Sequence, residues 1–360
     1  MPIPRPGITY NETVATITEP IEVEEVLCFI VQTSETLPGD GQLTLYESFD
    51  AFSAVATNKG LPKTLELINN ILASTGATEF YVYSVKTDTA SGFTTAVTSN
   101  THYKEIRRVI YFEETASSEA NPIRVKMNAL ASACHTTSHN GSFRKAIVIP
   151  YGTVEDAVND EDAQGLPQDI ALNTITGINP DSDGRLYVFM PDNYIAMINH
   201  LLETPEGVEP GFEYVDGVDT PKYVWTYDQM DTLRNAGINF LEPERVNGVT
   251  SYRIHLGVTT GAKTDKADRL IASREIADAL LRDIDTELSV YIKGPKNDER
   301  EAMAQETVDN VIQSYVSRLY VDAEGTTLVL TDNGDMTYAL NGTITPTRTL
   351  VAIEVNTILQ

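Results

Sequence analysis

The chain has 360 residues, 41% of them hydrophobic, so it is long enough for two or three domains with ordinary cores. Its formal net charge is −26, from 52 acidic and 26 basic residues, and such a surface repels a nucleic acid backbone. Its two cysteines predict no disulfide framework, and no apolar run reaches the ~18 residues that a membrane-spanning helix needs. We therefore expect a protein that folds in a cytoplasm, binds no nucleic acid and is not embedded in a membrane.

The first twenty residues predict an extended arm. A proline-rich start is followed by Ile8, Tyr10 and Val14, which alternate with polar residues as in a strand. No second strand follows closely enough to form a hairpin with it. Such a strand either frays or pairs with something else.

Strands and helices alternate from residue 25 onward. Residues 25–33 and 79–85 predict buried strands, and residues 48–56 and 61–74 between them predict helices, with Ser48 as an N-cap. This alternation is typical of an α/β layer. Further strands are predicted at 107–112, 144–150 and 186–190, and further helices at 122–136 and 194–202.

Three segments of the middle of the chain predict surface loops. Residues 86–102 are rich in Thr, Ser and Ala and predict a loop or hairpin. Residues 154–169 are acidic and predict solvent-facing helix and loop. Residues 204–220, rich in Gly, Pro, Glu and Asp, predict an exposed excursion.

A hairpin and a long helix are predicted between residues 237 and 292. Two short apolar runs, 237–241 and 251–256, flank an Asn-Gly turn, which is a strong hairpin signal. A glycine-punctuated loop then leads into an amphipathic helix. Arg274, Asp278 and Arg282 form an i, i+4 ladder on one side of it, expected to contribute a few tenths of a kcal/mol per pair. Its apolar face carries Ala277, Leu281, Ile284, Leu288 and Tyr291.

The chain closes with a helix and three strands. Residues 297–319 predict a second amphipathic helix, and 326–330 and 337–343 predict strands on either side of a turn. Residues 350–359 predict a last strand, in which every second residue lies on one face. That face carries Val351, Ile353, Val355, Thr357 and Leu359.

One loop imitates a phosphate-binding site. Gly257–Thr264 follows a predicted strand and precedes a helix, but Ala262 stands where a glycine is needed before Lys263. A nucleotide-binding enzyme that uses Lys263 and Thr264 therefore stays open as an alternative. A monomeric, acidic binding module is a second alternative.

The remaining motifs assign no catalytic, cofactor-binding or metal-binding residue. Cys134, His135 and His139 lack a fourth ligand for a metal site. Asp181–Gly184 imitates part of a calcium loop, but Arg185 stands where an oxygen ligand is wanted and no glutamate closes the loop. We expect no enzyme activity and no cofactor.

Several segments, taken in order, resemble the sheath subunit of contractile phage tails and related injection machines. The order along the chain carries the resemblance, which covers roughly residues 6–85 and 235–360. The segments are Pro-Gly-Ile-Thr-Tyr-Asn-Glu at 6–12, Ser-Phe-Asp-Ala-Phe at 48–52, Asn-Ala-Gly-Ile-Asn at 235–239 and Leu-Gly-Val-Thr-Thr at 256–260.

The resemblance implies a mixed α/β (α+β) fold of sheet and helices with extended terminal arms. Its core is expected from residues 21–85 and 226–345, with residues 86–225 as an inserted, outward-facing domain. Residues 1–20 and 346–360 are the arms. In such proteins the arms add as strands to neighbouring subunits, so Ile8, Tyr10, Val14, Val351, Ile353, Val355 and Leu359 are the expected subunit-interface residues.

The same resemblance implies a mechanical function. Six-subunit rings of the protein are expected to stack around an inner tail tube and to contract, driving the tube through a cell envelope. The expected partners are copies of the chain itself, the tube protein, and baseplate and tail terminator proteins. The expected location is a virion tail assembled in the host cytoplasm.

Overall fold

The computed structural model describes most of the chain between residues 25 and 347. The two predicted arms lie outside the described residues, apart from Pro346 and Thr347. The described residues are 25–33, 35, 37–38, 41–85, 90–99, 103–114, 122–139, 142–148, 184–190, 193–205, 208–211, 213–221, 225–246, 248–255, 257–261, 270–292, 297–332 and 338–347.

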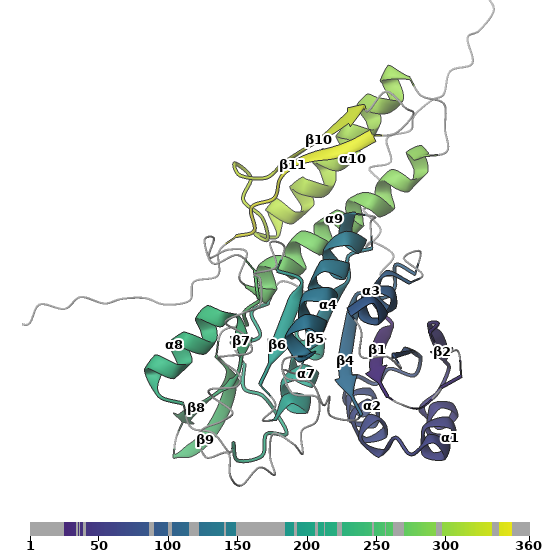
Figure 1. The fold of residues 1–360 in the computed structure, drawn as a ribbon. Helices are drawn as coiled ribbons and strands as arrows, with labels where there is room; N and C mark the ends of the chain where they lie inside the picture. The colour runs from purple at the N-terminus through teal and green to yellow at the C-terminus, as the bar shows by residue number, and fades with distance from the viewer. Residues whose placement is uncertain are drawn as a thin grey trace, which may run out of the picture.

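A seven-stranded, mostly parallel sheet forms the larger body (Figure 1). Only β2 runs antiparallel to its neighbour β3. The strands β1, β3, β5 and β6 are buried along their whole length, as expected for a sheet covered on both faces. In sheet order the strands are β2 (Thr44–Tyr46), β3 (Phe80–Val85), β1 (Leu27–Gln32), β4 (Arg108–Glu113), β5 (Lys145–Val148), β6 (Leu186–Phe189) and β7 (Ile238–Asn239).

The helices of this body begin and end where local chemistry favours it. Ser48 caps α1 by accepting a hydrogen bond from the Ala51 N–H. Gly76 ends α2 in the left-handed conformation, at φ 69°. Both helices confirm the sequence prediction. The set comprises α1 (Phe49–Lys59), α2 (Pro62–Thr75), α3 (Ala90–Thr98), α4 (Pro122–His139), α7 (Tyr194–Glu203) and α8 (Tyr227–Ala236).

The helix α3 corrects the prediction of a loop or hairpin for residues 86–102. Its Thr- and Ser-rich sequence has low helix propensity, but Phe93 and Val97 are fully buried in the main core. The buried guanidinium of Arg144 donates to the carbonyl oxygen of Val97, and to that of Ser99 at 2.9 Å. Tertiary packing and a cation at the C-terminus of the helix therefore outweigh propensity.

Three other predictions change in the structure. The expected exposed excursion, residues 204–220, contains the buried residues Glu209 and Val215. The helix α4 continues to His139, three residues beyond its predicted end at residue 136. The helix α8 was not predicted; Thr226 starts it with a complete capping box.

Strands of the predicted middle domain are central to the sheet. β4, β5 and β6 come from within residues 86–225, yet they pair in one continuous sheet with β1 on one side and β7 on the other. In the described part of the chain, the boundaries at 86 and 225 thus do not separate two sheets. Where an outward-facing domain begins stays a prediction.

A second, smaller body continues from the first through α9 (Ile271–Ile292) (Figure 1). It consists of the C-terminal part of α9, α10 (Asp298–Ser317) and a hairpin of β10 (Thr327–Asp332) and β11 (Tyr338–Thr343). These elements bury a separate hydrophobic cluster, which includes Leu280, Ile284 and Val308. The predicted helices and strands of this region are confirmed.

A further hairpin, β8 (Leu241–Val246) with β9 (Val249–Ile254), confirms the Asn-Gly turn signal. Its strands are shifted from the prediction: residues 238–239 of the first predicted run form β7 of the main sheet, and the hairpin strands meet closer to the turn, where Val246 pairs with Val249. Ile254 and Leu241 lie in the main core. The hairpin therefore belongs to the larger body.

Buried charges fasten α9 to the amino ends of the parallel strands. Asp278 is fully buried and receives two hydrogen bonds of 2.9 Å from the guanidinium of Arg185 and one of 2.7 Å from Arg274. Glu275, one turn earlier, pairs with the buried Lys145 of β5. The predicted i, i+4 pair of Arg274 and Asp278 forms, but its expected contribution of a few tenths of a kcal/mol is too small, because Asp278 is the centre of a buried ion network.

The network keeps both carboxylates ionised. Burial alone would raise the pKa of Glu275, but Lys145 and Arg108 outweigh it and lower that pKa to about 2. The pKa of Asp278 is likewise held well below its usual value: burial opposes this, while Arg274, Lys145 and Arg185 cause it. Since these pKa values are depressed, the stability that Glu275 contributes is present above about pH 4.5 and is lost as the pH falls through about 2.

Replacing Asp278 with alanine is expected to lower the free energy of unfolding by about 3–5 kcal/mol, because Arg185 and Arg274 then lose their buried partner. Chemical denaturation followed by circular dichroism measures this. The matched control is Glu287→Ala on an exposed position of the same helix, expected to change stability by less than ~0.5 kcal/mol. Equal effects of the two substitutions would contradict the network's role.

Candidate strand-docking site

The β10–β11 hairpin has one face packed against helices and one exposed face. Leu328, Leu330 and Leu340 point toward the helices of the smaller body and belong to its core or pack against it. Thr327 and Thr331 lie on the opposite, exposed face. This alternation is the one expected of a sheet covered by helices on one side.

The hairpin is a two-stranded sheet, so each strand has an outer edge. The N–H of Leu330 and the carbonyl of Leu328 bond to a side chain of α10, so they point away from β11. In an antiparallel pair the opposite residues, Leu340 and Gly342, then also turn their N–H and C=O groups outward. Among the described residues no strand pairs with this edge of β11.

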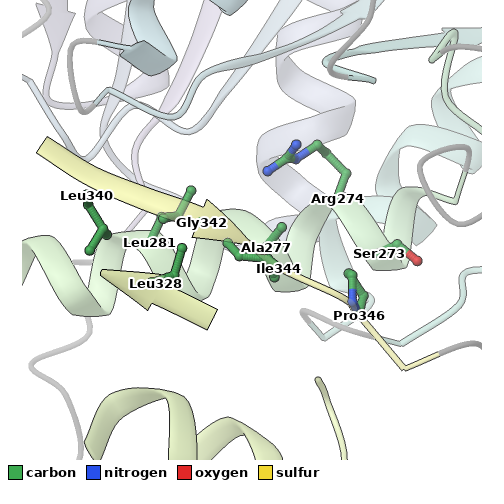
Figure 2. Close-up of a pocket in the computed structure, with 9 residues that line it drawn as sticks. All are labelled: Ser273, Arg274, Ala277, Leu281, Leu328, Leu340, Gly342, Ile344 and Pro346. Atoms are coloured by element: carbon green, nitrogen blue, oxygen red, sulfur yellow. The ribbon is translucent and has the colours of Figure 1, made fainter. Parts of the chain in front are cut away.

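A groove runs between β11 and α9 (Figure 2). Its cavity volume is about 290 Å³. Mostly apolar side chains from the helix and from the hairpin's inner face form its walls. The lining residues are Ser273, Arg274, Ala277, Leu281, Leu328, Leu340, Gly342, Ile344 and Pro346.

Gly342 allows the close approach of the two strands. Its φ of 157° is rarely adopted by other residues, and an added Cβ would lie 1.8 Å from the carbonyl oxygen of Thr327. β11 therefore requires glycine at this point. An extended segment added along the outer edge of β11 would place every second side chain over the groove.

The chain leaves the hairpin in a fixed direction. Thr345 accepts a hydrogen bond from the Asp322 N–H at 2.8 Å, and the Thr347 N–H donates to the carbonyl of Tyr320 at 2.9 Å. Pro346 forms an antiparallel bridge with Val321. Residues 345–347 are thereby held along the segment that follows α10, and the C-terminal residues 348–360 start from there.

All seven residues predicted from the sequence for the subunit interface lie outside the described residues. The structure thus places none of them against the hairpin, and their role stays a prediction. The structure adds a candidate site that the sequence did not reveal, namely the outer edge of β11 above an apolar groove. The signal available in the sequence was the apolar alternation of residues 338–344, with Gly342 inside it.

In the loop that resembles a phosphate-binding site, the backbone N–H groups are already hydrogen-bonded within the protein. The Gly257 N–H donates to Glu209, the Val258 N–H to Asn239 at 2.8 Å and the Thr260 N–H to Leu186 at 3.1 Å. A phosphate cradle needs such N–H groups to point at the ligand. Lys263 and Thr264 lie outside the described residues. The described part of this loop is therefore built for packing.

Glu209 is buried beneath this loop with one unsatisfied oxygen. Its Oε1 accepts from the N–H groups of Gly257 and Gly211, while Oε2 has no hydrogen-bond partner in the described structure. Burial raises the pKa of Glu209 to about 7, against the lowering effect of the two backbone donors. The folded protein therefore keeps Glu209 protonated up to about pH 7, and the stability linked to this group is fully present below about pH 4.5 and is lost as the pH rises through about 7.

Metal-binding clusters and membrane-spanning helices are both absent from the described residues. There, no group of three or more His, Cys, Asp and Glu side chains could hold a metal ion. Cys134 is fully buried in α4, and Asp181–Asp183 lie outside the described part. None of the described helices has the length and apolar character to cross a membrane.

The fold, a mostly parallel sheet joined by one long helix to a helix–hairpin unit, is similar to that of solved contractile sheath proteins. The chain is similar over 93% of its length to the helical sheath of an anti-feeding prophage in the contracted state, covering 93% of that chain, with 13% identity and a TM-score of 0.60. It is similar to the contracted sheath complex of an extracellular contractile injection system, with 12% identity, coverage of 93% and 92%, and a TM-score of 0.64.

A sheath tail protein from Listeria innocua is similar as well, with 8% identity, coverage of 91% and 93%, and a TM-score of 0.60. No family model and no curated protein matches the sequence. At these identities the similarity establishes the fold. It agrees with the mixed α/β, sheath-type fold expected from the sequence.

Replacing Glu209 with glutamine is expected to flatten the pH dependence of stability. Between about pH 4.5 and pH 8, the free energy of unfolding of the unmodified protein should fall by up to ~3 kcal/mol more than that of the variant. The reason is that the buried carboxyl group of Glu209 must ionise over this range, whereas the amide of glutamine carries no charge. Denaturation curves of both proteins at the two pH values measure it. Parallel curves would show that Glu209 does not titrate in this range.

Replacing Ala277 with phenylalanine is expected to fill the groove without unfolding the protein. A synthetic peptide of residues 348–360 should bind the unmodified chain and lose at least about tenfold in affinity for the variant, because its apolar side chains no longer find space. Fluorescence anisotropy measures the binding. Ala302→Phe on an exposed position of α10 is the matched control, and equal binding to both variants would exclude this groove.

Proposed function

We propose that the protein is a structural sheath subunit of a contractile tail or injection machine. Its copies form stacked six-subunit rings around an inner tube, and the assembly shortens and widens to drive the tube through a cell envelope. The fold supports this over nearly the full chain. The observation that carries it is the outer edge of β11 above an apolar groove, in a chain that also has strand-forming termini.

The strands predicted from the sequence at the two termini suit the edge of β11. In the alternating segment 350–359, Val351, Ile353, Val355 and Leu359 share one face, which suits the apolar walls of the groove. Main-chain hydrogen bonds along β11 would supply affinity, and alternate side chains in the groove would supply specificity. The arm of residues 1–20, with Ile8, Tyr10 and Val14, is a second donor of the same kind.

The occupant is a strand from a second copy of the chain. Residues 345–347 are bonded along residues 319–326, so the terminal segment starts beyond the end of its own hairpin. Thirteen further residues span at most about 43–47 Å when extended, enough to reach a neighbouring subunit. Donor and acceptor are different surfaces, so the contact is heterologous and propagates into rings or a helix.

In this proposal the chain is not an enzyme and uses no cofactor. The work of contraction comes from the difference in free energy between two packings of the same subunits. The partners are other copies, the tube protein, and baseplate and terminator proteins, and the location is a virion tail or equivalent particle assembled in the host cytoplasm. The nucleotide-binding alternative loses support because the donors of its loop are already bonded.

Removing residues 348–360 is expected to abolish assembly while leaving the described core folded, because the hydrogen bonds of Thr345 and Thr347 remain. Negative-stain electron microscopy at increasing concentration measures tubes or stacked rings. Circular dichroism checks the fold. A chain that sediments as a single 39.6 kDa species at every concentration, even when intact, would favour a monomeric binding module.

A point variant tests the same strand without shortening it. Ile353→Asp places a charge on the apolar face, whereas Asn356→Asp places the same charge on the opposite face. Only the first should block tube formation. Tubes that form from the Ile353→Asp or the shortened chain would overturn the donor-strand proposal.

A further inference from the structure

One side chain occupies the outer edge of β10. The side-chain amide of Gln305, on α10, donates from Nε2 to the carbonyl of Leu328 at 3.0 Å and accepts from the N–H of Leu330 at 2.8 Å. These are the two backbone groups that flank Val329 on the edge away from β11. The amide therefore takes the place of the N–H and C=O groups of one residue of a neighbouring strand.

The orientation of this amide is fixed by a second partner. Nε2 of Gln305 also donates to the carboxylate of Asp309, one helical turn along α10, at 2.9 Å. A carboxylate accepts hydrogen bonds only, so it selects the side of the amide that carries hydrogen. Both Nε2 hydrogens and the oxygen of Gln305 are thus used, and the half-buried side chain is held in place.

The two edges of the hairpin are therefore unequal. At the β10 edge, an incoming strand must first displace the Gln305 amide, so two of its hydrogen bonds replace two that already exist. At the β11 edge, Leu340 and Gly342 turn their backbone groups outward, and no described strand pairs with them. A strand that docks on β11 therefore forms new hydrogen bonds without breaking any hydrogen bond described within the protein.

We propose that Gln305 is an edge cap, which closes β10 to strands from other copies and leaves the β11 edge as the first to accept one. This inference rests on the proposed function, since it assumes that strands of neighbouring copies dock on the hairpin. It assigns an order to the two donors: the first arm docks on β11, and a second docks on β10 only by displacing Gln305. It also protects the free subunit from uncontrolled edge-to-edge association.

The test compares the full-length protein with Gln305→Ala and Gln313→Ala. Gln313 lies two turns further along α10 on an exposed position, so it controls for the loss of a glutamine from the same helix. The critical concentration for assembly is measured by light scattering and electron microscopy. Gln305→Ala should lower it on the order of tenfold, the factor that about 1.4 kcal/mol supplies, while Gln313→Ala leaves it unchanged.

Hydrogen exchange of the dilute, unassembled proteins gives a second reading. The amide of Leu330 should exchange slowly in the unmodified chain and faster in Gln305→Ala, whereas the amide of Leu340 should exchange fast in both. Asp309→Ala should shift both measurements in the same direction as Gln305→Ala, and by less, because it loosens the amide without removing it.

Each outcome decides a different point. A critical concentration that is unchanged or higher in Gln305→Ala would overturn the cap and show that Gln305 only braces the hairpin against α10. An intact protein that fails to assemble while Gln305→Ala assembles would support the cap. If none of the proteins assembles at any concentration, the proposed function fails and this inference fails with it.

Discussion

The attachment of α9 to the sheet through Asp278 and Glu275 is the constraint on which the rest of the structure depends. Two buried acids on adjacent turns meet Arg185 and Lys145 at the amino ends of two parallel strands. Removing these charges from water is costly, and only good geometry and several hydrogen bonds offset the cost. A helix shifted by one residue would leave charges unpaired. The network therefore fixes the register of α9, and with it the position of the smaller body.

Charge has a different role at the surface. With a formal net charge of −26, copies of this protein repel one another at long range, and salt screens that repulsion over about 8–10 Å. Attraction between copies must then come from short-range contacts. Backbone hydrogen bonds along β11 and apolar side chains over the groove are of this kind. The buried ion network thus fixes the register of α9 on the sheet, while the acidic surface limits the association of copies.

Much of this architecture is predictable from local patterns. Alternation, caps and the Asn-Gly turn identify β1, α1 and the β8–β9 hairpin, since each signal is local. The helix α3 was missed because Phe93 and the Arg144 cap act through tertiary contacts. Asp278 was misjudged because i, i+4 spacing does not tell a surface pair from a buried one. Gln305 bears no sequence signal at all, since its role depends on where β10 packs against α10.

The helix α9 also has a mechanical consequence. A strand added to β11 would lie along α9, as β10 and β11 do (Figure 2). Tension along that strand strains its whole ladder of hydrogen bonds together in shear, rather than opening the bonds one by one from an end. The 22 residues of α9, about 33 Å of helix, then act as a strut that passes the force to the charges under the sheet.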